Sequence, residues 1–167
     1  MRSIAATDIE FRGYYPGVLG EIIRLHAVYY LEYWGFDISF ETQEGRELCE
    51  FMARFNPESD GLWTAVANDR FAGSVAIDGY FSSTEGARLR WFIVEPAFQG
   101  LGIGRDLIRK AVEFSRSAGH KKIYLWTFEG LDAARCLYER AGFRFAEMRE
   151  VNQWGDIIRE QKFELAL

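Results

Sequence analysis

The chain has 167 residues, a length that suits one domain (residues 1–167) whose hydrophobic core needs no disulfide to hold it. Half of the residues are apolar and 16% are aromatic, which argues against disorder, while no apolar run is long enough to cross a membrane. The net charge of −5, with acids and bases interspersed, disfavours nucleic acid as a main partner and permits a cationic substrate.

The N-terminal half begins with an extended segment and continues with two helical patterns. Apolar side chains recur every three or four residues after Pro16-Gly17 and again after the turn at residues 34–37, which predicts two consecutive amphipathic helices. Ser39 is the expected N-cap of the second helix, and Asn56-Pro57 ends it. A β-hairpin follows. The expected elements are a strand over Asp8–Arg12, a helix to about Tyr33, a helix from Ser39 to about Phe55, and strands over Leu62–Ala67 and Phe71–Ile77 joined by Asn68-Asp69-Arg70.

The C-terminal half follows the order strand, helix, strand, helix and a closing antiparallel pair. Because a strand-helix-strand unit crosses over with a right hand, its two strands should be parallel. The expected elements are strands over Leu89–Val94 and Lys122–Phe128, helices from about Gly102 to Ala118 and from Leu131 to Ala141, and strands over Phe143–Val151 and Asp156–Leu165. The predicted fold class is α/β (α+β), a mixed sheet of about seven strands with about four helices on its two faces.

The most informative segment is the glycine-rich turn Gln99–Arg105, which joins an apolar strand to an amphipathic helix. Such a turn leaves several backbone N–H groups unpaired at the positive end of the helix dipole. The turn holds no Asp or Glu, and no Ser, Thr, Asn or Asp stands ready as an N-cap. The pattern therefore predicts a site for a phosphate or diphosphate, with Arg105 as the first charge after the glycines.

Two common phosphate motifs do not fit this turn. A P-loop needs Lys-Ser or Lys-Thr after its last glycine, and a dinucleotide fingerprint needs a third glycine where Arg105 or Leu107 stands. The remaining pattern is Q-x-x-G-x-G, made by Gln99, Gly102 and Gly104. This segment resembles the acyl-CoA loop of the GNAT superfamily of N-acetyltransferases.

Three further segments carry the same resemblance, and they stand in the family's order. Arg88–Pro96 is similar to its central strand, Lys122–Thr127 to the next strand, and Ala133–Phe143 to its last helix with the ending L-Y-x-x-x-G-F. The well-matched part runs from about Ala87 to Phe145. The chain also resembles acetyltransferase domains fused behind winged-helix (MarR-type) regulators, although it is too short to include such a partner. The resemblance implies a GNAT-like sheet whose central parallel strands splay apart.

The resemblance implies acetyl-CoA as co-substrate and assigns roles to its binding residues. The backbone of Phe92, Ile93 and Val94 would hold the pantetheine arm, and an N–H near Ile93 would polarise the thioester carbonyl. Tyr138 occupies the position whose phenol reprotonates the leaving thiolate. Leu131 stands where the family often has Asn, with Asp132 as a possible helix cap instead. The diphosphate would be held by Gln99, Gly100, Leu101, Gly102, Ile103, Gly104 and Arg105.

The acceptor implied by the resemblance is a primary amine of a small molecule or peptide. Asp78 and Glu129, each at the end of a strand, are candidates for the general base, with a solvated strand-end charge as the alternative for both. The turn between the first two helices borders the acceptor site in the family, so Trp34, Phe36 and Asp37 could contact substrate. Packing in the core is the alternative role for these aromatic residues.

Other features point to a cytoplasmic protein without a metal. Cys49 and Cys136 are expected as free thiols in a reducing compartment, and neither His26 nor His120 has ligand spacing. Residues Met1–Asp8 lack a signal-peptide core, and a homodimer is possible because family members are often dimers. Two other functions remain open: a non-catalytic acyl-CoA-binding sensor, and a binder of another phosphorylated ligand.

Overall fold

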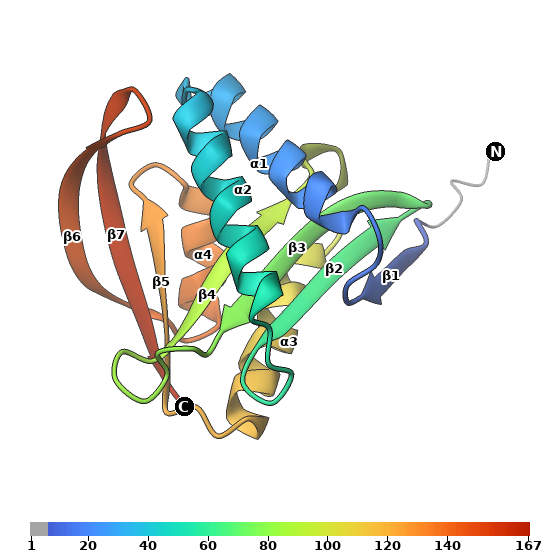
Figure 1. The fold of residues 1–167 in the computed structure, drawn as a ribbon, viewed down its shortest axis with the longest axis vertical. Coiled ribbons are helices and arrows are strands. Elements are labelled where there is room, and N and C mark those ends of the chain that lie inside the picture. The colour runs from blue at the N-terminus through green and yellow to red at the C-terminus, as the bar shows by residue number, and fades with distance from the viewer. Residues whose placement is uncertain (1–6) are drawn as a thin grey trace.

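The computed structural model describes residues 7–167, and the first six residues, on which part of the signal-peptide prediction rests, lie outside them. Seven strands form one sheet in the order β1-β2-β3-β4-β5-β7-β6 (Figure 1). The elements are β1 (Ile9–Arg12), α1 (Val18–Trp34), α2 (Ile38–Ala53), β2 (Gly61–Ala67), β3 (Arg70–Asp78), β4 (Ala87–Val94), α3 (Ile103–Ser117), β5 (Lys122–Phe128), α4 (Asp132–Arg140), β6 (Arg144–Gln153) and β7 (Asp156–Ala166). The predicted fold class and element order are confirmed.

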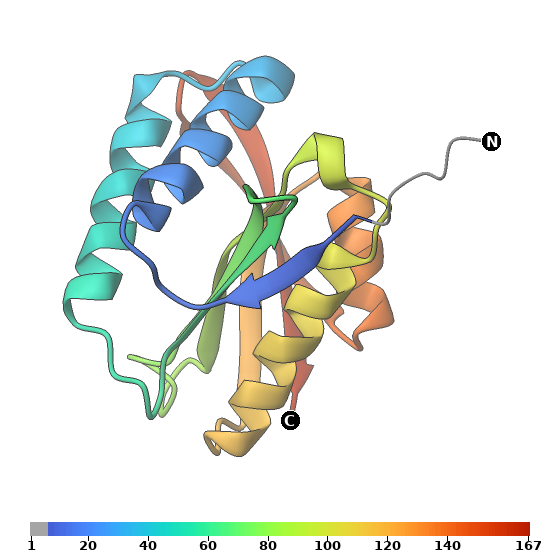
Figure 2. The ribbon, with the colours of Figure 1, turned by 90° about the vertical axis from the view of Figure 1, so that its right-hand side faces the viewer.

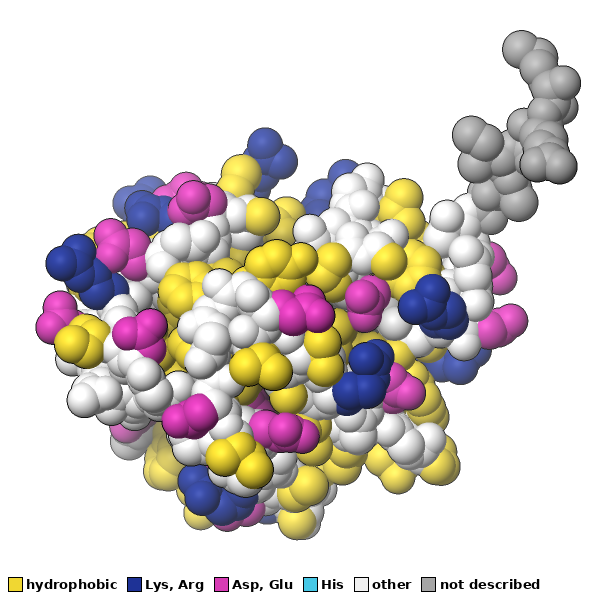
Figure 3. Space-filling view, turned by 90° about the horizontal axis from the view of Figure 1, so that it is seen from above, with side chains coloured by type: hydrophobic (Ala, Val, Ile, Leu, Met, Phe, Trp, Pro, Cys, Tyr) yellow, Lys and Arg dark blue, Asp and Glu magenta, His cyan; other side chains and the backbone are white. Residues whose placement is uncertain are grey.

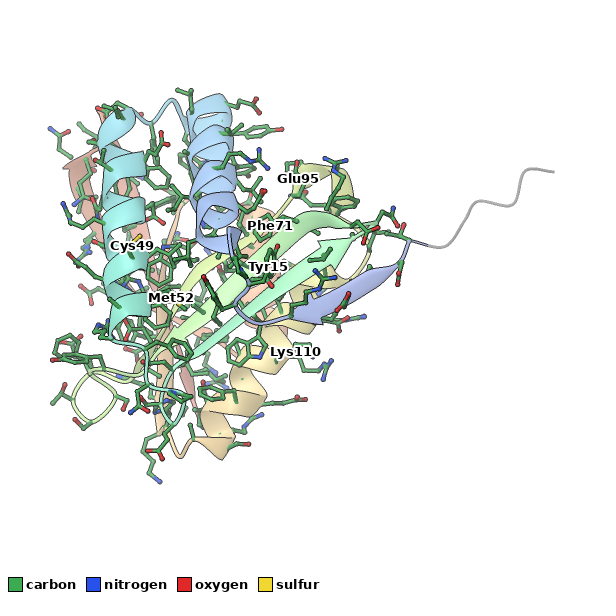
Figure 4. The ribbon with its side chains drawn as sticks, turned by 45° about the vertical axis from the view of Figure 1, so that its right-hand side comes forward. Tyr15, Cys49, Met52, Phe71, Glu95 and Lys110 are labelled. Carbon is green, nitrogen blue, oxygen red and sulfur yellow. The ribbon has the colours of Figure 1, made fainter. Side chains whose placement is uncertain are left out.

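Helices cover both faces of the sheet, α1 and α2 on one and α3 and α4 on the other (Figure 2). Two of the three buried clusters among the described residues lie on the two faces of the sheet. One lies between the α1–α2 pair and the sheet, where Tyr15, Met52 and Phe71 meet (Figure 4). The other joins α3 and α4 to the opposite face, and on this side Lys110 of α3 lies 4.9 Å from the centre of the Phe11 ring. The sheet is therefore covered on both sides around its central strands.

The starts of two helices differ from the prediction. The N-cap of α2 is Asp37, not Ser39, because the Asp37 carboxylate accepts from the Ser39 backbone N–H at 2.9 Å and Asp37 keeps an extended backbone. Asp132 does not cap α4 either, since Leu131 is the N-cap and no side chain caps this helix. An N-cap residue stands just before the first helical residue. The sequence pattern placed the N-cap of α2 two residues too late, at Ser39, and the possible cap of α4 one residue too late, at Asp132.

A bulge in β4 changes the direction of its side chains. Trp91 has a left-handed backbone with φ of 47°, and the register with β3 shifts between Ser74 and Ala76. As a result Arg90 and Trp91 both face the α1–α2 side, and alternation resumes with Phe92 directed to the α3 side. The Ser74 hydroxyl donates to the Trp91 carbonyl at 2.7 Å and fixes the bulge.

The predicted splay of the central strands is confirmed. β4 and β5 are the parallel pair of the sheet, and only Ala87 with Ile123 and Arg88 with Tyr124 are in register. Beyond these two pairs the strands part. The edge of β4 that faces β5 therefore has no partner strand from Leu89 to Val94, while the other edge stays paired with β3. On its other edge β5 pairs with β7 over seven consecutive positions.

Candidate active site

The parting of β4 and β5 opens a cleft of about 1380 Å³ that runs through the sheet. On one side it is lined by the glycine-rich turn, the start of α3 and the inner face of α4. On the other side it is lined by α1, α2 and part of the β6–β7 hairpin. Two ligands, one on each face of the sheet, can therefore reach the middle of the cleft.

The glycine-rich turn presents free donors to the first side of the cleft. Gly100 and Gly102 have φ of 81° and 83°, a conformation that glycine adopts without strain, and Gly102 is the N-cap of α3 without a side-chain cap. Within residues 7–167, the backbone N–H groups of residues 100–105 donate to no protein oxygen. They meet the positive end of the helix dipole, so this end of the cleft can bind an anion.

The side chains around the turn leave the anion position open. Arg105 is exposed and curls back beside Gly102. The one acid of the first turn, Asp106, lies 3.7 Å from Arg105 and 3.8 Å from Arg109, which offset its charge. Leu101 is 46% exposed and does not line the cleft, whereas the other residues predicted to hold the diphosphate do.

The middle of the cleft follows the unpaired edge of β4. Phe92, Ile93 and Val94, to which the resemblance assigns the pantetheine arm, all line it. Gln99 reaches back toward this strand, with its amide nitrogen 3.4 Å from the Val94 carbonyl. An extended chain with amide groups could bind along this edge as an added strand.

Tyr138 lines the cleft from α4 on the side of the glycine-rich turn. Its ring packs against Phe92 and Phe163, with centroids 5.6 Å and 6.3 Å away, and the residue is only 5% exposed. Burial raises the pKa of the Tyr138 phenol well above its ordinary value of 10. The hydroxyl therefore stays protonated at neutral pH, so it can give up a proton but cannot act as a base.

A carboxyl group that the sequence analysis missed lines the opposite side. Glu44, on α2, is partly buried in the cleft wall, and burial raises its pKa to about 7 against the opposing fields of Arg90 and Arg88. The neighbouring carboxylate of Glu47 adds to the rise, and the Trp91 side chain opposes it. A carboxyl with this pKa can both accept and release a proton near pH 7.

The sequence did contain a signal for Glu44. Phe40, Glu44, Glu47 and Phe51 follow one another at spacings of four, three and four, so both carboxylates lie on the apolar stripe of α2. Charged residues on a buried stripe face either a partner or a cavity. Here Glu47 pairs with Arg90, and Glu44 faces the cleft.

The two bases proposed from the sequence lie away from the cleft wall. Asp78 binds Arg54 through both oxygens, at 3.0 and 2.6 Å, and also lies 3.4 Å from Arg90. Burial raises its pKa, but these partners outweigh burial and leave the pKa below the ordinary value. Glu129 is exposed and lies 3.4 Å from Arg159. Asp78 lines a smaller depression, and neither residue lines the cleft.

The turn predicted to contact substrate lies behind the cleft wall. Phe36 is buried in an aromatic cluster with Phe40 and Trp154, Trp34 packs against that cluster, and Asp37 caps α2. None of Trp34, Phe36 and Asp37 lines the cleft, whereas Phe40 and Trp154 do. The turn therefore supports this side of the cleft through Phe40 and Trp154, which pack on it.

His26 also lines the cleft but carries no charge at neutral pH. Its Nδ1 lies 2.8 Å from the Ile22 carbonyl, and burial lowers its pKa to about 4. Among the described residues there is no group of three or more His, Cys, Asp or Glu that could hold a metal ion, and no helix long and apolar enough to span a membrane. Seen from above, the molecule mixes acidic, basic and apolar side chains without a continuous basic surface on that face (Figure 3).

Comparison with known proteins agrees with this arrangement. The model of the Acetyltransferase (GNAT) family matches residues 25–143, which include α2, the glycine-rich turn and Tyr138. The chain belongs to the GNAT acetyltransferase family. Within the family, the chain is 30% identical over 125 residues to an uncharacterized N-acetyltransferase of Methanocaldococcus jannaschii, a match that covers 72% of this chain and 55% of that protein. The chain thus spans little more than half the length of this relative.

Other GNAT relatives match locally or in fold. The N-alpha-acetyltransferase RimI of Mycobacterium tuberculosis is 41% identical over 56 residues, or 34% of each chain. Among solved structures, a GNAT acetyltransferase of Staphylococcus aureus has a TM-score of 0.76 at 16% identity, covering 95% of this chain and 99% of that one. YncA of Salmonella typhimurium, solved with its cofactor acetyl-CoA, has a TM-score of 0.75 at 17% identity, covering 95% and 94%. The structural matches show the shared fold.

Proposed function

We propose that this GNAT chain transfers an acetyl group from acetyl-CoA to a primary amine of a small molecule or peptide by direct attack. The observation that carries the proposal is the uncapped, glycine-rich start of α3, whose free N–H groups open onto the gap between β4 and β5. The acetyl-CoA found in YncA, which shares this fold, supports the choice of ligand.

In this proposal the coenzyme enters from the side of α3 and α4. Its diphosphate binds the N–H groups of residues 100–105, and charge-assisted bonds of about 1.5–3 kcal/mol each make this the main anchor. The pantetheine arm lies along Phe92–Val94 as an added strand. A backbone N–H near Ile93 then donates to the thioester oxygen, where negative charge develops as the amine attacks.

The amine enters from the side of α1 and α2, where it must lose a proton. An alkyl amine with a pKa of about 10.4 is neutral in only about one molecule per few thousand at pH 7. Glu44 is the best-placed base among the described residues, because it lines this side of the cleft and its pKa is about 7. It accepts one proton, directly or through water, as the C–N bond forms.

The C–S bond breaks in the second half of the reaction, and the coenzyme leaves as a thiolate. Tyr138 donates a hydrogen bond to the developing negative charge and then its proton to sulfur. The raised pKa of Tyr138 makes the phenol a weaker acid, and the same dry surroundings offset this because they disfavour the thiolate and so raise the pKa of the thiol. Amide and free thiol are the products. The proton taken up by Glu44 restores the Tyr138 phenol, and the proton that the alkylammonium loses before it attacks is the one released to solvent.

Two measurements test the proposal. Calorimetry with acetyl-CoA, CoA and ATP shows whether the cleft prefers the acyl coenzyme to another phosphorylated ligand. A thiol-release assay with acetyl-CoA over a panel of amines then tests for catalysis. Tight binding of acetyl-CoA with no thiol release over the whole panel would favour a non-catalytic sensor, and preference for ATP would overturn the coenzyme assignment.

A further inference from the structure

The charged side chains on the acceptor side of the cleft are mostly paired with each other. Arg90 forms an ion pair with Glu47 and a second contact with Asp78 at 3.4 Å. Arg149 binds Glu160 at 2.6 Å. Removing these pairs from the set of charged groups that line this side leaves one cation, Arg88, and one carboxyl, Glu44.

Arg88 has no partner within residues 7–167. Its side chain forms no hydrogen bond or ion pair there, and its Nε is buried without an acceptor. Its cross-strand neighbour Asp78 is already bound by Arg54 and Arg90. A guanidinium stays charged at any pH a protein tolerates, so a partly buried one without an acceptor is costly unless a ligand supplies the anion.

The position of Arg88 places it at the acceptor end. It belongs to the last register pair before β4 and β5 part, opposite Tyr124, and it lines both the cleft and the smaller depression beside it. Its charge acts on Glu44 across the cleft, yet the two side chains form no ion pair. A ligand of the right size can therefore lie between the carboxyl and the guanidinium.

We propose that the acceptor is a free amino acid or a close analogue, which binds Arg88 through its carboxylate and directs its amine at Glu44. This inference rests on the proposed function and names its substrate class. Such a zwitterion adds no net charge to the cleft. Its carboxylate supplies the hydrogen-bond acceptor that the Arg88 guanidinium lacks. A peptide N-terminus is disfavoured, because its first carboxylate has become an amide. The aromatic walls made by Phe40, Trp126 and Phe128 favour an apolar side chain.

The experiment compares compounds that differ only at the carboxylate. The free amino acids are assayed with acetyl-CoA, and the best one is compared with its carboxamide and with its decarboxylated amine. The amino acid should exceed both by roughly 10- to 100-fold in kcat/KM, the range that a charge-assisted hydrogen bond supplies. In Arg88→Gln, KM for the amino acid should rise by a similar factor with kcat little changed, and the preference over the carboxamide should disappear.

Matched variants separate this effect from a loss of folding. Arg46→Gln removes an exposed arginine from α2 that does not line the cleft, so it should leave every constant unchanged. Arg88→Lys keeps a positive charge and should retain part of the preference. Arg88→Gln should melt no lower than the native protein, since it removes an unpaired cation from a partly buried position.

A binding measurement keeps this inference distinct from the proposed function. Calorimetry of the amino acid with protein saturated with CoA reads the Arg88 site without turnover. If amino acids bind there and Arg88→Gln abolishes the binding, the inference stands even when no acetyl group is transferred. If no amino acid binds, or if the carboxamide and the amine serve as well as the acid and Arg88→Gln changes nothing, the inference is wrong.

Discussion

A β-carbon on Gly104 would lie 2.9 Å from Cδ1 of Leu137, closer than two carbons approach in folded proteins. The same carbon would lie 3.3 Å from Cζ of Phe92 and 3.5 Å from Cγ2 of Val94. At this point α3 meets both α4, which carries Tyr138, and the free edge of β4. The glycine therefore sets how closely the anion-binding turn approaches the rest of the coenzyme side.

Gly104→Ala should weaken acetyl-CoA binding by roughly tenfold, because Leu137 and Phe92 must move and both line the cleft. Overpacking costs about 1–3 kcal/mol and alanine returns about 1 kcal/mol of helix propensity, so the melting temperature should fall only slightly. Calorimetry and thermal unfolding measure the two effects. The control is Gly20→Ala in α1, where a β-carbon meets nothing within 4 Å and should stabilise the protein without affecting binding.

Gly102→Glu should abolish detectable binding of acetyl-CoA, because it places a negative charge and a side chain where the diphosphate would lie. Gly119→Glu is the matched control at the other end of the same helix. Gly119 has φ of 81°, close to the 83° of Gly102, so both variants carry similar backbone strain. Equal loss of coenzyme affinity in the two variants would contradict an anion site at the start of α3.

Glu44→Gln should lower kcat/KM by roughly 100-fold or more, in the range that a general base contributes. The native protein should gain activity as pH rises through about 7, where Glu44 loses its proton, and the variant should lack this step. Deprotonation of the amine substrate also increases activity as pH rises, and this increase is the same for the native protein and the variant. Glu50→Gln, an exposed change on the same helix, should keep the native pH profile.

The stability of Glu44→Gln provides a second test of the same carboxyl. The pKa of Glu44 in the folded protein, about 7, lies above its ordinary value of 4.5. Native protein therefore binds more protons than unfolded chain between these values, and the charged carboxyl lowers stability as pH rises through this window. The variant should unfold at a higher denaturant concentration than the native protein at pH 8, and the difference should vanish near pH 4.

Tyr138→Phe should lower turnover at least about tenfold and leave acetyl-CoA affinity nearly unchanged. The ring contacts with Phe92 and Phe163 remain, so folding should be preserved. Single-turnover measurements of thiol release separate the chemical step from binding. Tyr14→Phe, at a residue that is 60% exposed, is the control, and a Tyr138→Phe enzyme of native turnover would remove the phenol from the mechanism.

Asp37→Ala should cost about 1 kcal/mol of stability, since it removes the N-cap of α2. Because Asp37 is exposed and does not line the cleft, KM for the amine should not change. Urea unfolding and steady-state kinetics give the two values. A raised KM at native stability would return Asp37 to the acceptor site that the resemblance first suggested.

Local signals in the chain were sufficient for the fold and for the glycine-rich turn on which the proposed coenzyme site rests. The glycines at 100, 102 and 104 and the apolar strand before them stand next to each other in sequence, so their spacing alone indicates the turn. Glu44 and Arg88 lie 44 residues apart in chain order. They line the same cleft only because α2 packs over the parted strands. Periodicity predicts which face of an element is apolar, but not which other element packs on that face. For this reason the sequence offered Asp78 and Glu129, at strand ends, as candidate bases and did not single out Glu44.

The two sides of the cleft are built from different parts of the chain. The residues proposed to hold acetyl-CoA come from β4 onward, whereas the proposed amine side is lined mainly by α1 and α2. Substitutions in α1 and α2 should therefore change which amine the protein accepts and leave the proposed binding of acetyl-CoA intact.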